Sequence, residues 1–321
     1  MSTIPNFDKI PSGEELKMVH NAIKPFINYT AVLSHPDINA MIGAEVFFKC
    51  ENFQSIGAFK IRGAAAAALG LSEEQLKNGL TTHSSGNHAQ AVAKIAKILG
   101  VPAYIVMPDN APSIKRKSTE AHGAKIIDCK ATTADREATL ERVVAETGAY
   151  FIHPYNDYNV IAGQATAAIE LMEQVSELDA IFAPIGGGGL MSGTALAIKA
   201  FAPKIKAVGS EPKEVDDAFK SLQAGYIIEN ISTNTIADGL RTTIREKTFD
   251  ILRNNLDEIY TVSEEEIITA MRIVWEKLKI TAEPSCVVPF AALLQQKNRF
   301  EGQRIGIIIT GGNVDLNKLP F

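Results

Sequence analysis

The stretch AIFAPIGGGGLMSGTALAIKAF (180–201) decides the fold class of this chain. It begins with a short apolar run, continues with four glycines (Gly186, Gly187, Gly188 and Gly189) and ends in an alanine-rich segment. We therefore expect a strand over 180–185, a glycine loop, and a helix over 190–201. Such a loop brings main-chain N–H groups together at the positive end of the helix dipole, which favours an anion such as phosphate.

Three interpretations of the glycine loop compete. A Walker A loop requires a lysine directly after its last glycine, but Thr194 follows Gly193 here. A dinucleotide-binding loop would have its third glycine one place earlier than Gly193, although Glu211, 25 residues after Gly186, could be its acidic residue. A plain tight turn would need only one or two glycines. We rank a phosphate cradle first, a dinucleotide site second and a plain turn third.

Short β-rich runs alternate with helical ones along most of the chain. Strands are expected at 80–83, 103–107, 125–128, 150–152, 205–209 and 304–309, and helices at 87–99, 113–121, 135–146 and 264–277. This alternation predicts an α/β protein with mostly parallel, twisted sheets, each covered by helices in three layers. We expect a small domain, 80–152, inserted into a large domain formed by 1–79 and 153–321.

The composition excludes several classes of protein. Of 321 residues, 46% are hydrophobic and 21% charged, which suits a globular protein of about two domains, and the net charge of −5 provides no basic surface for nucleic acid. The longest apolar runs are too short to cross a membrane, and residues 1–8 do not resemble a secretory signal. Cys50, Cys129 and Cys286 lack metal-binding spacing, so we expect reduced thiols in a cytoplasmic protein.

Lys60 lies in the segment GAFKIRG (57–63). Gly57 and Ala58 leave room for a cofactor, Phe59 can lie on a flat ring, and the isoleucine after the lysine indicates burial. A buried lysine has a depressed pKa and can form an imine with an aldehyde. Together with a phosphate cradle, this lysine predicts an aldehyde cofactor with a phosphate tail. The alternative is an ordinary surface lysine.

Several further motifs are spread over the chain. They are FFKCENFQ (47–54), SSGNHAQ (84–90), AGQ (162–164), TIADG (235–239) and TGGN (310–313). With the Lys60 segment and the glycine loop, they make the chain resemble the fold-type II pyridoxal-phosphate enzymes, whose fold is that of the tryptophan synthase β chain. The resemblance is to the branch of serine racemases and serine/threonine dehydratases, which includes the 3-hydroxyaspartate ammonia-lyases.

The resemblance implies a cofactor, pyridoxal 5′-phosphate, in the cleft between the two domains. Lys60 would hold it as a Schiff base. The roles of the other residues follow the family: Gly186–Gly189 with Leu190 for the phosphate, Asn87 for the ring hydroxyl, Thr310 for the pyridine nitrogen, and Phe59 and Gly239 for the two faces of the ring. A hydroxyl opposite the ring nitrogen gives a weaker electron sink than a carboxylate, which favours loss of a β-substituent. Thr310 would also suit a cap of the glycine turn that follows it.

The motif Ser84-Ser85-Gly86-Asn87-His88 is expected at the start of a helix. Free N–H groups and hydroxyls there would bind a substrate carboxylate, so we assign Ser84, Ser85, Asn87 and His88 to substrate binding. An ordinary helix cap by serine or asparagine is the alternative. We favour packing at the helix start over metal binding for His83 and His88, since no second pair stands at ligand spacing.

Ser85 bears on the choice of reaction. Lys60 is the natural base for the Cα proton, and racemisation also needs an acid on the opposite face. By resemblance that acid is Ser85, a position where dedicated threonine dehydratases more often have alanine. We therefore expect a serine racemase that also converts L-serine to pyruvate and ammonia. The alternatives are a 3-hydroxyaspartate ammonia-lyase, whose side-chain carboxylate Arg136 could meet, a serine/threonine dehydratase without racemase activity and, remotely, a nucleotide-binding sensor without enzymatic activity.

Further sites follow from the resemblance. Glu211, Asp217 and the Val215 carbonyl resemble a divalent-cation site, for Mg²⁺ or else Mn²⁺ or Ca²⁺; an acidic loop capping a helix is the alternative. Activation by ATP is not expected, because TAVLSHP (30–36) departs from the nucleotide segment of animal serine racemases and Ser55 replaces a lysine there. The expected partners are a small hydroxy-amino-acid substrate and a second copy in a homodimer.

Overall fold

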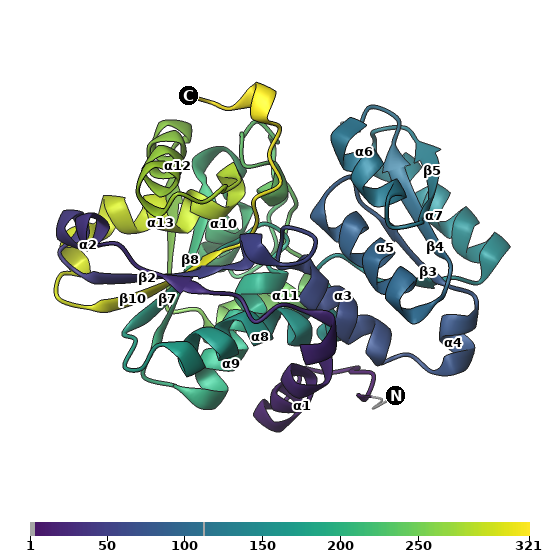
Figure 1. Cartoon of the computed structure of the whole chain (residues 1–321), viewed down its shortest axis with the longest axis horizontal. Helices are drawn as coiled ribbons and strands as arrows, with labels where there is room; N and C mark the ends of the chain where they lie inside the picture. Colours follow the sequence, from purple (N-terminus) through teal and green to yellow (C-terminus); the bar gives the residue numbers. More distant parts are fainter. Residues whose placement is uncertain (1–3, 112) are drawn as a thin grey trace.

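The computed structural model describes residues 4–111 and 113–321. They form two sheets that lie side by side, with helices between and around them (Figure 1). The larger sheet has the strand order β1-β2-β10-β7-β8-β9. Its strands are β1 (Val32–Leu33), β2 (Glu45–Cys50), β7 (Ala180–Pro184), β8 (Lys206–Pro212), β9 (Glu258–Val262) and β10 (Arg304–Ile309). All neighbours in it are parallel except β1 and β2.

Helices cover both faces of the larger sheet, which makes three layers (Figure 1). On one face lie α1 (Gly13–Ile23), α8 (Tyr158–Gln174), α9 (Gly189–Phe201) and α11 (Glu246–Asn255), and on the other lie α2 (Pro36–Ile42), α12 (Glu264–Leu278) and α13 (Pro284–Gln296). The helix α10 (Asp217–Ala224) packs against α11 and the edge strand β9. The central helices α8 and α9 have few charged residues and are buried over most of their length. A helix that is apolar on all sides is stable only inside a core.

The smaller sheet has the order β5-β4-β3-β6 and is parallel throughout. Its strands are β3 (Leu80–His83), β4 (Ala103–Pro108), β5 (Lys125–Cys129) and β6 (Tyr150–Phe151), and its helices are α5 (Asn87–Leu99), α6 (Ser113–Glu120) and α7 (Thr133–Thr147). The helix α4 (Glu73–Lys77) leads into β3. Gly100 and Gly148 end α5 and α7 in the left-handed conformation that favours glycine.

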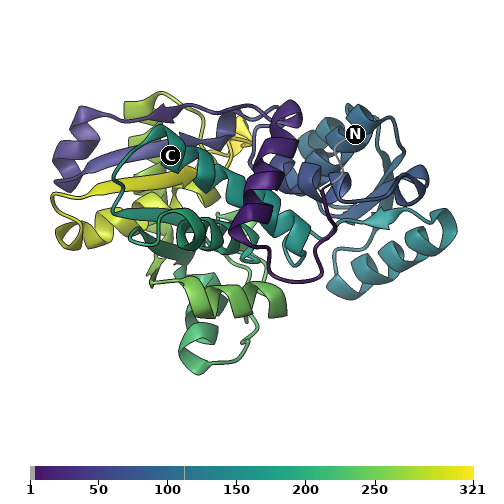
Figure 2. The same cartoon turned by 90° about the horizontal axis from the view of Figure 1, so that it is seen from below.

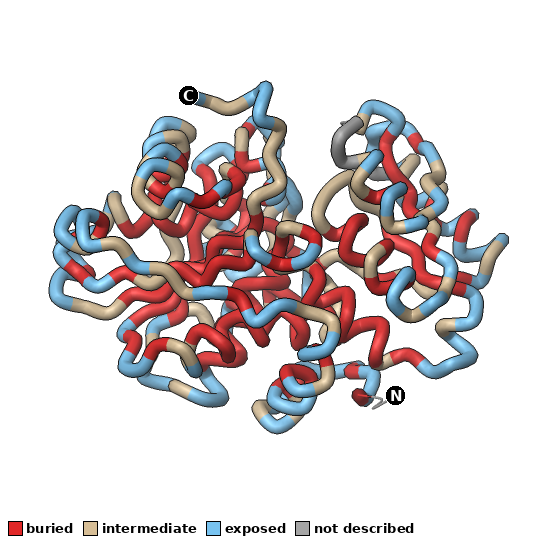
Figure 3. Tube along the Cα trace, viewed as in Figure 1, coloured by how far each residue is buried: buried red, intermediate tan, exposed pale blue. Residues whose placement is uncertain are grey.

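The helix α3 (Lys60–Leu69) lies between the two sheets and contacts both α8 and α5 (Figures 1 and 2). All of its residues after Lys60 are buried. The burial colours show a nearly continuous buried band through the larger sheet, α8 and α3 (Figure 3). The first residue of α3 therefore lies where the two halves of the molecule meet.

The predicted fold class, α/β with mostly parallel sheets, is confirmed. Each strand and helix expected from the sequence is present, with ends displaced by at most three residues. Among the described residues, no helix is long and apolar enough to span a membrane.

Candidate active site

Lys60 begins α3, next to the loop that follows β6. Its Nζ donates a hydrogen bond to the Pro154 carbonyl oxygen at 2.9 Å and lies 5.2 Å from the centre of the Phe59 ring. Burial lowers the pKa of Lys60 to about 8, although the negative charge of Glu283 acts in the opposite direction. A substantial fraction of this amine is therefore neutral near pH 8, as attack on an aldehyde requires.

A chain of amide groups links Asn87 to Glu283. The Asn87 Nδ2 donates to both carboxylate oxygens of Glu283 at 3.2 Å, and its Oδ1 accepts from Asn313 Nδ2 at 2.8 Å. Asn313 Nδ2 also donates to the Ile56 carbonyl at 2.8 Å. Because a carboxylate and a carbonyl only accept, this chain fixes which way both amides point. The predicted ligand of the cofactor's ring hydroxyl thus has one defined orientation.

The glycine loop follows β7 and leads into α9. It is tightly packed: a Cβ on Gly187 would lie 2.4 Å from the Tyr155 ring, and one on Gly186 would lie 2.9 Å from the Leu240 Cα. Gly188 has φ +86°, in the left-handed region. The loop is buried, yet within the described residues the N–H groups of 187–190 donate no hydrogen bond. Buried N–H groups normally find acceptors, so this arrangement fits a bound anion.

Thr310 and Gly239 lie on two segments next to Lys60 and the glycine loop. Thr310 follows β10, is 3% exposed, and accepts a hydrogen bond from Phe59 N at its carbonyl oxygen (2.9 Å). Gly239 N donates to Ser285 Oγ at 3.0 Å, and the Gly239 carbonyl lies against Gly186. The structure therefore brings the predicted ring-binding residues together from four separate parts of the chain.

The serine-rich turn lies between β3 and α5. Ser84 Oγ accepts a hydrogen bond from Gly86 N at 3.2 Å, and Ser85 is half-buried beside it. No side chain caps α5, so the turn is not an ordinary helix cap. The His88 ring points away from the turn, because its Nε2 is 3.1 Å from the Ile152 carbonyl oxygen. Burial lowers the pKa of this ring well below its usual value. This observation supports the packing interpretation of the His88 ring.

A group of aromatic and basic side chains extends from the small sheet toward Lys60. The His83 ring stacks on Phe151 at 5.6 Å, and His153 lies 4.7 Å from Tyr155. Burial, followed by the charges of His83 and Lys60, lowers the pKa of His153 to about 3. Its Nδ1 accepts from two main-chain N–H groups, so the neutral ring carries its proton on Nε2.

Arg136, on α7, is the outermost member of this group. Its positive charge lowers the pKa of His83, after the larger effect of burial. Its Nε is buried and has no hydrogen-bond partner among the described residues. A buried guanidinium donor without an acceptor, near the Lys60 side of the small sheet, suits an anionic group of a ligand.

Glu211 and Asp217 form a second buried site, at the end of β8 and the start of α10. Glu211 accepts from Ala218 N at 3.2 Å and Phe219 N at 2.8 Å, so Glu211 caps α10, whereas Asp216 makes no side-chain cap. Burial and mutual repulsion raise the pKa of Glu211 well above its usual value, and burial raises that of Asp217 to about 6.

The chemistry of this donor set fits a hard divalent cation. Glu211 is 0% and Asp217 1% exposed, and Val215 lies on the short turn between them (η3, Lys213–Val215). Both carboxylate oxygens of Asp217 accept a hydrogen bond, Oδ1 from Asn230 Nδ2 and Oδ2 from Ile244 N. No group of three or more His, Cys, Asp or Glu residues suited to a metal occurs in the described part of the chain. A cation would therefore need a carbonyl or water in addition to these two carboxylates.

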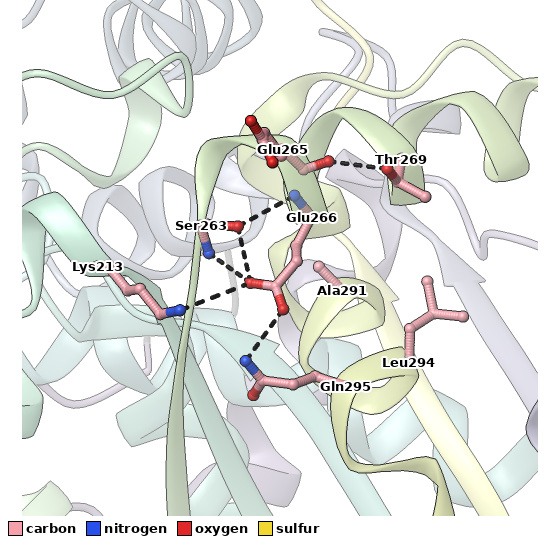
Figure 4. Close-up of a pocket in the computed structure, with 8 residues that line it drawn as sticks. All are labelled: Lys213, Ser263, Glu265, Glu266, Thr269, Ala291, Leu294 and Gln295. Atoms are coloured by element: carbon pink, nitrogen blue, oxygen red, sulfur yellow. Dashed lines mark hydrogen bonds and ion pairs between the residues drawn. The ribbon is translucent and has the colours of Figure 1, made fainter.

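Two surface pockets lie away from these residues. One, of about 500 Å³, lies between α12 and α13 (Figure 4). Its main polar group, Glu266, is already paired with Ser263, Gln295 and Lys213. The other, of about 810 Å³, lies along α1 and the ends of α8 and α9. Neither is lined by a predicted site residue.

The comparisons with known proteins agree with this geometry. The model of the family described as pyridoxal-phosphate dependent enzyme matches residues 23–311. The chain belongs to this family of pyridoxal-phosphate-dependent enzymes. It is 47% identical to a β-hydroxyaspartate dehydratase of Paracoccus denitrificans (97% of this chain, 99% of the relative) and 45% identical to a serine racemase of Dictyostelium discoideum (95% and 96%). The solved structure of maize serine racemase matches with a TM-score of 0.94 at 45% identity, covering 96% of this chain and 95% of that one.

Sequence reasoning missed several residues of the site. Glu283, which bonds Asn87 and acts on Lys60, was not predicted, and neither were Pro154, Tyr155 or Ser285. The segment TAEPS (281–285) contains Glu283 directly before α13, which is the only local signal that could have pointed to it.

Proposed function

We propose that this enzyme is a serine racemase that also eliminates water from L-serine to give pyruvate and ammonia. The observation that carries the proposal is the link between Lys60 and the serine-rich turn. The carboxylate of Glu283 bonds Asn87, two residues after Ser85, and its charge also acts on the Lys60 amine. This link supports the assignment of the Lys60 amine, on α3, and the Ser85 hydroxyl, before α5, to one site.

In the proposed mechanism, bound pyridoxal 5′-phosphate supplies the electron sink for the electrons released from Cα. Lys60 takes the Cα proton at Nζ, for which its depressed pKa suits it. Ser85 Oγ gives a proton to the opposite face, which inverts the centre. If the β-hydroxyl leaves before that proton arrives, it would take a proton, for which the protonated Lys60 Nζ is available, and depart as water. The released enamine becomes an imine, and water hydrolyses this imine to pyruvate and ammonia. The turn N–H groups, including that of His88, and the side chains of Ser84, Ser85 and Asn87 would bind the substrate carboxylate, whereas the His88 ring packs toward Ile152.

The buried N–H groups of the glycine loop support its role as the phosphate site. Gly186–Gly189 and Leu190 would hold the phosphate, Phe59 and Gly239 would flank the ring, Asn87 would bond its hydroxyl, and Thr310 would face its nitrogen. The cofactor would lie between a small domain, 80–152, and a large domain of 1–79 with 153–321. These limits agree with the division of the strands between two sheets.

We extend the proposal to the cation and to the assembly. The buried pair Glu211 and Asp217, with the Val215 carbonyl, would bind Mg²⁺ or a similar cation. ATP is not proposed as an activator, since Thr30, in the departing segment, is engaged with Glu51 and Lys49. By family analogy the enzyme would be a homodimer, and its free cysteines suit the cytoplasm.

Ser85→Ala tests the two-face assignment. We expect it to abolish D-serine formation and to retain most pyruvate formation from L-serine, measured by chiral chromatography and keto-acid assay of one reaction. Lys60→Ala is the companion variant and should lose both activities. If Ser85→Ala lowers both activities equally, Ser85 does not act on the second face. Borohydride reduction and peptide mapping should place the cofactor on residue 60.

A second candidate is a 3-hydroxyaspartate ammonia-lyase. The buried Arg136 Nε without a partner favours it, because the β-carboxylate of that substrate would supply the missing acceptor. The relationship to the Paracoccus dehydratase gives it further support. A serine/threonine dehydratase without racemase activity would differ only in forming no D-serine. Membership in an enzyme family leaves no support for the non-enzymatic sensor.

Arg136→Lys separates the two main candidates. It keeps the positive charge but removes the Nε donor and the planar fork. If hydroxyaspartate is the substrate, KM for that compound should rise by about tenfold or more, whereas KM for L-serine should change little. Equal effects on both substrates would assign Arg136 a structural role and leave serine as the preferred substrate.

A further inference from the structure

Four charged side chains form a fully buried cluster behind Lys60: Lys49 on β2, Glu51 on the following turn (η2, Glu51–Phe53), Arg62 on α3 and Glu170 on α8. Each side chain is at most 1% exposed. Two positive and two negative charges make the cluster neutral. We call these four residues the buried ion cluster.

Arg62 uses every donor it has. Its Nε and Nη2 donate to the two oxygens of Glu51 at 2.7 and 2.8 Å, and its Nη1 and Nη2 donate to the two oxygens of Glu170 at 2.8 and 2.7 Å. The fifth N–H, on Nη1, reaches Thr166 Oγ1 at 3.0 Å. A guanidinium has five N–H donors in one plane, so two carboxylates on two other elements fix this plane completely.

The other members are also satisfied. The three donors of Lys49 reach Glu170 at 2.6 Å, the Gln174 side chain at 2.8 Å and the Thr30 carbonyl at 2.9 Å. Glu51 accepts from the Thr30 hydroxyl and from Gln54 as well as from Arg62. Buried ion pairs are often no more stabilising than apolar residues of the same size, so stability alone does not account for such a cluster. A complete directional network does define one geometry.

The geometry that the cluster defines is the placement of α3. Lys60 and Arg62 are two residues apart, so they point to nearly opposite sides of the helix. Lys60 reaches the Pro154 carbonyl, next to Tyr155, which packs against the glycine loop, and Arg62 faces the cluster. The start of α3 has no side-chain cap among the described residues, and the Phe59 N–H bonds the Thr310 carbonyl there. Two residues into the helix, the cluster adds fixed side-chain contacts at Arg62. The rotation of α3 about its axis, and hence the direction of the Lys60 side chain, depends on the Arg62 fork.

Close contacts at two glycines connect the position of α3 with that of the glycine loop. A Cβ on Gly163 of α8 would lie 2.4 Å from the Arg62 carbonyl oxygen, and one on Gly193 of α9 would lie 2.6 Å from the Ala165 N of α8. The helices α3, α8 and α9 are thus packed backbone to backbone, and α9 begins at the glycine loop. The distance between the Lys60 amine and the loop is therefore set through α8.

We propose that Arg62, held by Glu51 and Glu170, is a positioning residue. It would fix the direction in which the Lys60 side chain points toward the cofactor aldehyde. The proposal rests on the assignment of Lys60 as the cofactor lysine. It does not depend on whether L-serine or hydroxyaspartate is the substrate.

The test compares Arg62→Lys with a core variant of similar stability in the purified holoenzyme. Lysine keeps the charge of Arg62 but cannot bridge two carboxylates in one plane. We expect kcat to fall by about 100-fold, as for a reacting group displaced by about 1 Å, with a much smaller change in KM. We also expect the pH midpoint of the visible absorption band of the lysine–cofactor linkage to shift, because the nitrogen has moved relative to its surroundings.

Val274→Ala is the matched control, since Val274 is fully buried on α12, away from the site. It should lower the melting temperature without changing kcat or the absorption midpoint. If Arg62→Lys changes only the melting temperature, as Val274→Ala does, the positioning role is wrong. If Arg62→Lys does not fold, Glu51→Gln gives the same test, since it keeps the shape of the side chain and disturbs the Arg62 fork. An unchanged midpoint and kcat in a folded Glu51→Gln would likewise overturn the proposal.

The absorption readout separates this proposal from the proposed function. If borohydride mapping fails to place the cofactor on Lys60, both proposals fall. If the cofactor is on Lys60 but D-serine does not form, the proposed racemase activity fails, whereas the shift of the absorption midpoint still tests Arg62.

Discussion

The buried ion cluster and the carboxylate pair Glu211/Asp217 are both removed from water, but their charges are balanced in opposite ways. In the cluster two cations meet two carboxylates, and every donor of Arg62 and Lys49 has an acceptor. In the pair, two carboxylates repel each other, and main-chain N–H groups and one amide are their described hydrogen-bond donors.

This difference teaches what each region does. A neutral, fully paired cluster holds elements in place and requires nothing from outside the chain. An unbalanced acidic pair is unfavourable by itself, because each buried carboxylate resists ionisation. A bound cation would offset this cost. The buried ion cluster therefore suits a role in holding the elements around it in place, and the acidic pair suits a role in cation binding.

The largest expected effect comes from breaking the balanced cluster. Glu170→Ala would leave the buried charges of Arg62 and Lys49 without their shared partner, which costs about 3–5 kcal/mol in the free energy of unfolding. Urea unfolding of the cofactor-free protein measures this. Lys206→Ala is the control, since the Lys206–Glu258 pair at 3.1 Å is exposed and such pairs contribute about 0–1 kcal/mol. Similar losses in the two variants would contradict the view that the cluster depends on complete pairing.

A smaller change in stability is expected at the acidic pair, where it comes from repulsion between like charges and not from the loss of a paired charge. Removing divalent cations with a chelator should lower the melting temperature. Restoring Mg²⁺ to 100 times its Kd should raise the free energy of unfolding by about 2.7 kcal/mol. Asp217→Asn should abolish this dependence on Mg²⁺. Without the cation, the variant should be at least as stable as the parent, because it removes one of two repelling charges. A Mg²⁺ effect that persists in Asp217→Asn would place the cation elsewhere.

The two regions also differ in how far the sequence could predict them. Glu211 and Asp217 are six residues apart, so the resemblance of one short segment to the family could suggest both. Arg62 and Glu170 are 108 residues apart, and only the packing of α3 on α8 brings them together. The motifs that contain Lys49, Glu51 and Arg62 were noticed for their resemblance to a family, but their mutual contacts were not foreseen.

The same limit applies within the candidate active site. Lys60 and the glycine loop were predicted because a strand, a loop and a helix start each have a local signature. Glu283 was missed, since its partner Asn87 is 196 residues away. The cap of α10 also depends on a contact across a turn, since Glu211 and not the adjacent Asp216 accepts from its first N–H groups. Burial and long-range pairing decide such cases, and neither can be read from neighbouring residues.

The smallest expected effect concerns Lys60, a buried charge that is only partly balanced. Since the neutral amine attacks the aldehyde, cofactor uptake by the cofactor-free protein should rise with pH, with a midpoint at about 8. Glu283 raises the pKa of Lys60, so Glu283→Gln should move the midpoint to lower pH by a fraction of a unit. The growth of the visible absorption band at a series of pH values measures the midpoint. Glu265→Gln, an exposed change on α12, should leave it in place. A midpoint that stays the same, or rises, in Glu283→Gln would show that burial alone sets the reactivity of this amine.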